Sequence, residues 1–248
     1  MAGGVRGVSA ARPRRGGWDV PRLAQAVVLA AWGGLFWTLL ATGRSSLYLS
    51  PRTAWVVPVG ALLCSAAALA RFATARAPRP ERLPRREAWA LVAVALPAVL
   101  VLALPPQTLS SYAASRRASF VRTGFSASPG EIASGTLTLL DVAAAQTSPE
   151  GERALASRAG ETASFVGFVD RRPGTPADEF LLTRFVVTCC VADATIVQVR
   201  VVDVPPGRFA PDDWVRVTGR IYPLGREVIL DASRIEPVEP PDRPYLTP

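Results

Sequence analysis

The stretch FLLTRFVVTCCVADATIVQVRVV, residues 180–202, contains two runs rich in Val, Ile and Phe on either side of a short turn. Such runs are typical of β-strands. The first run, residues 180–190, ends on two adjacent cysteines, Cys189 and Cys190, and Asp193 follows in the turn. The stretch therefore predicts a β domain and places its most distinctive side chains at the end of one strand.

Similar runs lie on both sides of this stretch and are separated by turn clusters rich in Pro and Gly. The five predicted strands are residues 165–169, 180–190, 195–202, 214–222 and 227–235. Gly167 and Gly219 fall inside strands, as expected where a small barrel bends sharply. We predict a mainly β (α+β) domain over residues 161–238, folded as an OB-like five-stranded Greek-key barrel, and a proline-rich tail over residues 239–248.

The segment that precedes the barrel, residues 107–160, is predicted to be a stalk with short helices. Residues 137–145 have helix-forming content. A second helix is predicted to begin after Ser148, because Ser is a good N-cap and Pro149 suits the first helical position.

The first part of the chain is apolar. Residues 23–42, 53–72 and 88–104 are each long enough, or nearly so, to cross a bilayer, and they define a predicted transmembrane region over residues 23–106. The first stretch could be a signal peptide, but its length and the lack of a small-x-small cleavage site favour a retained helix. Residues 1–22 are predicted to be a disordered cytoplasmic arm.

Arginine placement predicts the orientation. Residues 1–106 carry a net charge of +10 and residues 107–248 a net charge of −2. Arginines cluster before the first apolar stretch and between the second and third, whereas the segment between the first two has only Arg44 and Arg52. The positive-inside rule then puts the N-terminus in the cytoplasm and the C-terminal domain outside it. The slightly acidic C-terminal half also argues against nucleic-acid binding.

The two adjacent cysteines allow three interpretations. Side chains of strand neighbours point to opposite faces, so the pair can be small buried hydrophobes. With Asp193, Cys189 and Cys190 can bind a soft or borderline metal such as zinc or copper, but a closed structural site takes four Cys or His ligands and the chain has no His. Outside the cytoplasm the pair can also form a vicinal disulfide or do thiol redox work.

The sequence predicts no enzyme. Without His there is no Ser-His pair and no HExxH motif, and no Gly-rich phosphate loop ends in Lys. Arg184 lies on the same run as the cysteines. We expect it to form a salt bridge with Asp193 that clamps the two ends of the turn, or to bind an anion.

Several motifs together resemble the bacterial YcgQ-like family of membrane proteins, over most of the chain. They are Arg184-Phe185, Cys189-Cys190, Ala192-Asp193-Ala194, Gly167-Phe168-Val169 and WVRVTGRIYP at residues 214–223. The resemblance implies a multi-pass protein of the bacterial plasma membrane, acting as accessory subunit to a multispanning permease that moves a solute or ion. It assigns no catalytic residue and no substrate. The alternatives are a standalone envelope protein that binds a soft metal, or a thiol-redox membrane protein.

Overall fold

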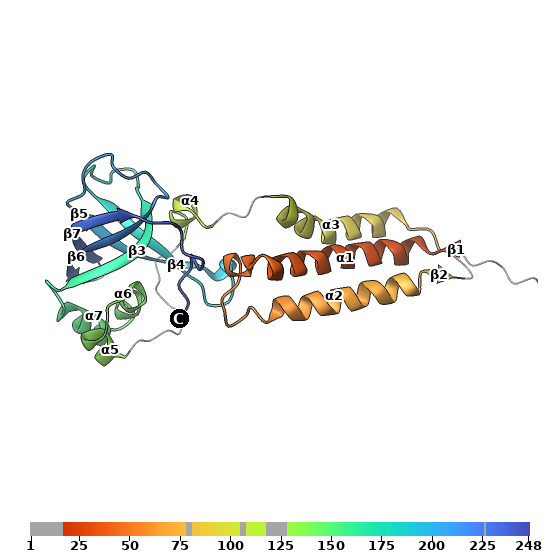
Figure 1. The fold of residues 1–248 in the computed structure, drawn as a ribbon, viewed down its shortest axis with the longest axis horizontal. Coiled ribbons are helices and arrows are strands. Elements are labelled where there is room, and N and C mark those ends of the chain that lie inside the picture. Colours follow the sequence, from red (N-terminus) through yellow and green to blue (C-terminus); the bar gives the residue numbers. More distant parts are fainter. Residues whose placement is uncertain (1–16, 78–80, 105–107, 118–127, 226) are drawn as a thin grey trace, which may run out of the picture. The chain divides into compact units, whose positions relative to one another are not determined.

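The computed structural model describes residues 17–77, 81–104, 108–117, 128–225 and 227–248. The chain divides into two compact units. One comprises Met1–Thr42 and Val56–Pro105, and the other comprises Gly43–Trp55 and Pro106–Pro248. The predicted arm, residues 1–22, lies mostly outside the described residues. Figure 1 shows long helices in the first unit and a sheet with short helices in the second.

Three long helices form the first unit: α1 (Val20–Ala41), α2 (Val56–Ala73) and α3 (Arg85–Ala103). All three are long and apolar enough to cross a membrane, which confirms the predicted number of transmembrane helices. Short strands β1 (Gly17–Trp18) and β2 (Arg76–Ala77) pair beside them. The chain is thus a multi-pass membrane protein by the length and composition of its helices.

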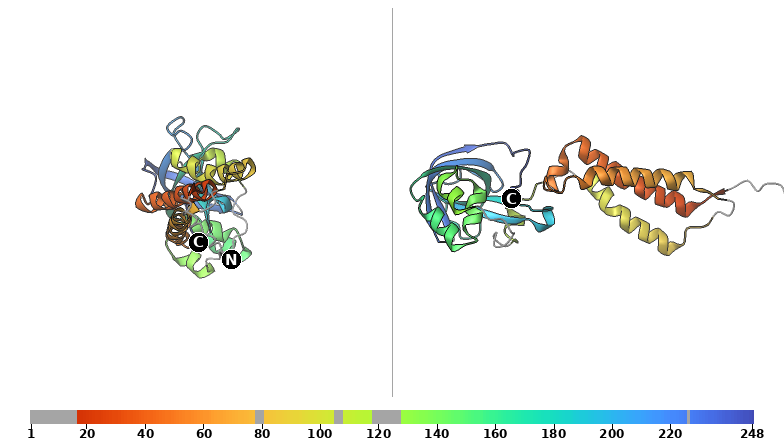
Figure 2. Two further views of the ribbon diagram at one scale, coloured as in Figure 1. Left: turned by 90° about the vertical axis from the view of Figure 1, so that its right-hand side faces the viewer. Right: turned by 90° about the horizontal axis from the view of Figure 1, so that it is seen from below.

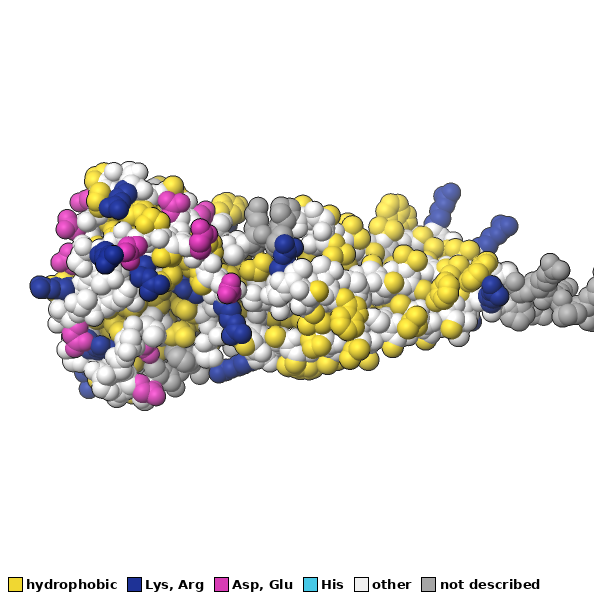
Figure 3. Space-filling model, in the orientation of Figure 1, with side chains coloured by type: hydrophobic (Ala, Val, Ile, Leu, Met, Phe, Trp, Pro, Cys, Tyr) yellow, Lys and Arg dark blue, Asp and Glu magenta, His cyan; other side chains and the backbone are white. Residues whose placement is uncertain are grey.

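Small residues let α1 and α2 approach closely. A Cβ atom on Gly60 would lie 2.9 Å from the ring of Phe36, and one on Gly33 would lie 3.2 Å from Ser65 Oγ. Close backbone approach of this kind is how helices associate in lipid. The outward faces carry large exposed apolar side chains, including Leu62, Trp89 and Leu96. On the face drawn in Figure 3, apolar side chains lie along this unit, and the acidic side chains that are visible lie over the barrel unit.

The second unit is built on a closed barrel with the strand order β3-β4-β5-β7-β6, which confirms the predicted five-stranded barrel. Neighbouring strands are antiparallel except β5 and β7, which pair in parallel. The strands are β3 (Thr162–Asp170), β4 (Phe180–Val186), β5 (Thr195–Val202), β6 (Trp214–Leu224) and β7 (Glu227–Pro237).

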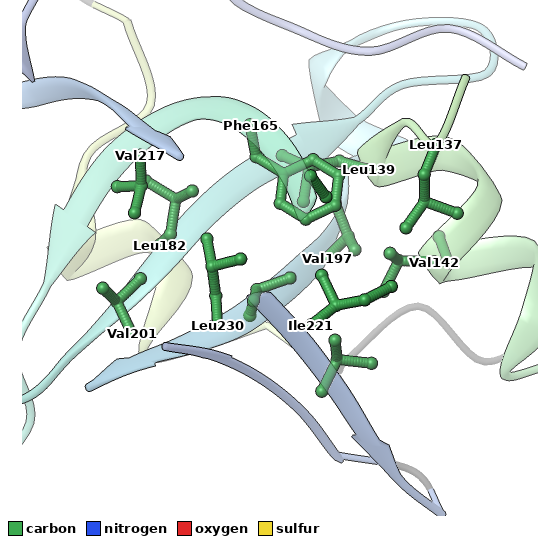
Figure 4. Close-up of a cluster of buried hydrophobic side chains, with 14 of the residues drawn as sticks. Leu137, Leu139, Val142, Phe165, Leu182, Val197, Val201, Val217, Ile221 and Leu230 are labelled. Atoms are coloured by element: carbon green, nitrogen blue, oxygen red, sulfur yellow. The ribbon is translucent and has the colours of Figure 1, made fainter. Parts of the chain in front are cut away.

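Inward-facing apolar side chains fill the barrel, as period-two alternation along each strand requires. Figure 4 shows members of this core from every strand, among them Phe165, Leu182, Val201, Val217 and Leu230, all buried. One end of the core is closed by three short helices, α5 (Pro129–Ser134), α6 (Leu139–Ala145) and α7 (Pro149–Ala156), which lie together against the barrel in Figures 1 and 2. Ile132, Val142 and Leu155 from these helices join the core.

The helices expected before the barrel are present. α6 lies within the predicted residues 137–145, and Ser148 caps α7 with its Oγ accepting from Gly151 N at 3.0 Å. A further single turn, α4 (Ser111–Ala114), precedes them. Within the predicted proline-rich tail, Leu246 pairs in parallel with Val186 at the end of β4.

Candidate functional site

The cysteine loop, residues 187–194, begins where β4 ends at Val186, so the predicted strand through residue 190 is wrong. Asp193 is the cause. Its Oδ1 accepts from Thr188 N at 3.1 Å, and its Oδ2 accepts from Cys189 N at 2.7 Å and Cys190 N at 3.3 Å. A carboxylate that satisfies three successive amides offers the backbone an alternative to the strand ladder.

Leaving the strand changes what the two cysteines can do. The expectation that strand neighbours diverge no longer applies, and the Sγ atoms of Cys189 and Cys190 lie with an Asp193 carboxylate oxygen within 4.8 Å of one another. Both thiols are free, Cys189 is exposed and Cys190 is half-buried. An exposed Cys189 is not a buried hydrophobe, so that interpretation is wrong for this residue.

The surroundings of Cys189 disfavour its thiolate. Desolvation raises the pKa of the Cys189 thiol, and the neighbouring Cys190, both by its charge and by a hydrogen bond, and the Asp193 carboxylate raise it further. A thiol with a raised pKa is a poor nucleophile near neutral pH. A bound cation would remove the mutual repulsion of these groups, because opposite charge favours the ionised form.

A second segment, far away in the sequence, holds the cysteine loop from its other side. We call it the α1–α2 connection; it comprises Gly43–Trp55 and includes the short helix η1 (Arg44–Leu47). Ser50 N donates to Cys189 O at 3.0 Å, and Thr53 Oγ1 donates to the same oxygen at 2.6 Å. Ser50 Oγ donates to Thr188 O at 2.7 Å.

Two further contacts complete this junction. Leu49 forms an isolated antiparallel bridge with Cys190, and Val191 N donates to Tyr48 O at 2.9 Å. Sequence reasoning missed these partners, because no spacing rule links positions some 140 residues apart. The one feature of the sequence that could have indicated this contact is the group of Ser and Thr side chains between the first two apolar stretches.

Arg117 is another residue that the sequence did not reveal. Its Nη1 donates to Val191 O at 3.0 Å and to Ala194 O at 2.7 Å, so it closes the carbonyl side of the turn η2 (Val191–Asp193). Both the amides and the carbonyls of the cysteine loop are therefore tied to side chains. The cysteine loop is thus bonded to side chains on both sides.

Arg184 does not join this site, and its predicted salt bridge with Asp193 is wrong. Its guanidinium donates to the carbonyls of Pro244 at 3.0 Å, Arg243 at 3.1 Å and Val166 at 3.2 Å, and it lies 5.1 Å from the ring centroid of Trp214. Burial lowers the pKa of Arg184 to about 10, which still leaves it charged at neutral pH. Arg184 thus fastens the C-terminal tail to the barrel.

Comparison with known proteins places a family match on the barrel unit. Residues 150–248 match the model of the DUF1980 C-terminal domain, a range that runs from α7 to the end of the chain and includes the cysteine loop and Arg184. The α1–α2 connection lies outside the matched range. No curated protein matches the chain. The resemblance to the YcgQ-like family, and the permease association that it implies, stay predictions.

Proposed function

We propose that this membrane protein binds a soft or borderline metal ion, zinc or copper, through Cys189 and Cys190. The observation that carries the proposal is the gathering of two sulfur atoms and one carboxylate oxygen within 4.8 Å. Thiolates select such ions over magnesium or calcium. Asp193 already accepts three amide bonds, so the two sulfurs form the core of the site and Asp193 supplies a weaker third ligand.

The chemistry of the site favours reversible binding. A closed structural zinc site uses four Cys or His ligands, whereas the cysteine loop offers two thiols and a carboxylate and leaves a coordination position for water or a partner's side chain. Cys189 is exposed, so an ion can enter and leave. The barrel has its own apolar core, to which neither cysteine contributes. These features suit a protein that senses, buffers or passes on an ion, and we propose a binding protein and not an enzyme.

Metal analysis of the purified full-length chain in detergent tests the proposal. After equilibration with zinc or copper(I) and removal of free metal, we expect about one ion per chain, as one dithiol site can hold. Cys189→Ser should lose the ion. Cys64→Ser is the matched control, because Cys64 lies within α2, and it should keep the ion. A wild-type chain free of metal, or a Cys189→Ser variant that retains it, would refute the proposal.

A second experiment, thiol alkylation, tests the thiol-redox alternative. Alkylation of the chelator-treated, metal-free protein without reductant labels two thiols at the loop if the pair is in the reduced form that binds metal. A pair that stays unlabelled until reductant is added would instead be a vicinal disulfide. The gathering of both Sγ atoms with an Asp193 carboxylate oxygen is the observation that favours the metal site over thiol exchange.

A second proposal concerns the membrane part, which we infer to be an accessory subunit of a multispanning permease. Ionisable side chains inside the membrane mark solute and ion pathways. In the described helices the charged residues lie only in terminal turns, at Arg22 of α1, Arg71 of α2 and residues 85–87 of α3. Three helices of this kind offer no pathway of their own, so a partner would provide it.

Site-specific crosslinking in native membranes tests this second proposal. A photoreactive residue at position 96 of α3 would face outward, since Leu96 is 51% exposed, whereas position 98 would not, since Ala98 is fully buried. We expect position 96 to capture a multispanning membrane protein and position 98 to capture none. Crosslinks to lipid alone from position 96 would argue for a standalone protein.

A further inference from the structure

We infer that Ser50 and Thr53 are positioning residues of the cysteine site, and that metal binding at Cys189 and Cys190 alters the α1–α2 connection. The inference rests on the proposed metal binding. It adds that the bound ion alters the segment that joins two membrane helices.

The peptide of Cys189 is where the two halves of the site meet. Its amide donates to Asp193 Oδ2, and its carbonyl accepts from both Ser50 N and Thr53 Oγ1. Its side chain is the more exposed of the two thiols. When the sulfurs close on an ion, the Cys189 backbone is fixed from a third direction. The geometry of its bonds to Ser50 and Thr53 must respond.

A short run of hydrogen bonds leads from Cys189 toward α2. Ser50 N donates to Cys189 O, and Ser50 O in turn accepts from Thr53 N at 3.1 Å and Ala54 N at 3.0 Å. Ala54 precedes the first residue of α2, Val56, by two positions. The connection is also short at its other end, because α1 stops at Ala41 and η1 begins at Arg44. Two successive hydrogen bonds therefore link Cys189 O to Ala54, two residues before α2.

Hydrogen exchange of the full-length protein in lipid nanodiscs, with and without zinc, tests the inference. The amide of Ser50 is itself a reporter, because it exchanges only when its bond to Cys189 O opens. We expect zinc to slow exchange in peptides from residues 43–55 by about tenfold, as strengthening a single hydrogen bond can do. In Cys189→Ser, zinc should leave this exchange unchanged.

The double variant S50A/T53V separates positioning from ligation. It keeps the backbone amide at position 50 and both thiols, but it removes the hydroxyl bonds to Thr188 O and Cys189 O. We expect it to bind zinc with the same stoichiometry and about tenfold lower affinity, and to show a weaker effect of zinc on exchange in residues 43–55, because the backbone bond from position 50 to Cys189 O remains. Ser45→Ala, on the same connection, is the control and should behave as wild type.

The outcomes distinguish the two proposals. A protein that binds no zinc refutes the metal site, and the inference falls with it. A protein that binds zinc at the cysteines while exchange in residues 43–55 stays the same overturns the inference alone, as does a double variant with wild-type affinity and response.

Discussion

Asp193 explains why two neighbouring cysteines can serve one ion. By accepting from the amides of Thr188, Cys189 and Cys190, it takes these residues out of the strand and turns both sulfurs toward its own carboxylate. The sequence spacing identified the three residues as a group. It could not reveal that Asp193 acts first on the backbone, because the same spacing is compatible with a strand, a turn or a salt bridge with Arg184.

The raised pKa of Cys189 predicts how metal affinity depends on pH. Metal binds the thiolate and displaces its proton, so a thiol with a raised pKa binds more weakly at low pH. The apparent affinity for zinc should rise by up to about tenfold per pH unit for each proton released, until the pH passes the pKa of Cys189. Competition with a chelating dye between about pH 6.5 and 9 would measure it. An affinity independent of pH over this range would contradict thiol ligation.

Arg184 makes a prediction about stability and not about metal. Arg184→Ala would leave the carbonyls of Val166, Arg243 and Pro244 without their buried donor and should destabilise the barrel unit by about 3 kcal/mol. Denaturant unfolding followed by tryptophan fluorescence would show this loss. Arg216→Ala, an exposed arginine on β6, should change stability by less than about 0.5 kcal/mol. Equal losses of stability in the two variants would show that the buried hydrogen bonds of Arg184 do not stabilise the barrel unit.

At the scale of elements, the local sequence pattern predicted most of the helices and strands. Runs of Val, Ile and Phe gave five strands because alternate side chains fill one barrel, and Ser148 and Pro149 gave the start of α7 because capping is local. Apart from the end of β4, which the nearby Asp193 moves to Val186, the features that the sequence pattern missed are long-range contacts. Leu246 pairs with Val186, Arg117 closes the cysteine loop, and Ser50 holds Cys189, and none of these contacts leaves a mark on nearby residues.

Gly219 is the element-scale feature that can be tested most simply. It lies at a register shift between β6 and β7, where an added Cβ would collide with the carbonyl oxygen of Asp231. Because backbone cannot move aside as a flexible side chain can, Gly219→Ala should destabilise the barrel by about 3 kcal/mol. Gly130→Ala, in α5 with open space around it, should be neutral or slightly stabilising. Thermal unfolding of both variants would measure these changes in stability. A Gly219→Ala variant as stable as the wild type would contradict the tight β6–β7 contact.

At the scale of the whole molecule, the junction at Cys189 constrains membrane topology. The α1–α2 connection and the barrel belong to one compact unit, so they lie on the same side of the membrane. Only α2 and α3 separate them in the sequence, and therefore both helices cross or neither does. Since both are long and apolar enough, two crossings are the natural solution. The arginine distribution then predicts that the shared side is the outer one.

Thiol labelling of intact cells tests this sidedness. In the background C64S/C190S, the remaining Cys189 is exposed and should react with a membrane-impermeant maleimide without lysis. In a second chain without native cysteines, Ala73→Cys at the exposed end of α2 should react only after lysis, because that end is predicted to face the cytoplasm. The opposite pattern would place the cysteine site in the cytoplasm.

X-ray absorption at the zinc edge of the metal-loaded full-length protein examines the paired-thiol site most directly, because it counts the sulfur atoms bound to the ion. We predict two sulfur ligands at about 2.3 Å, with lighter atoms filling the remaining positions, and one sulfur fewer in Cys190→Ser. A spectrum with oxygen and nitrogen ligands alone, unchanged by that substitution, would contradict it.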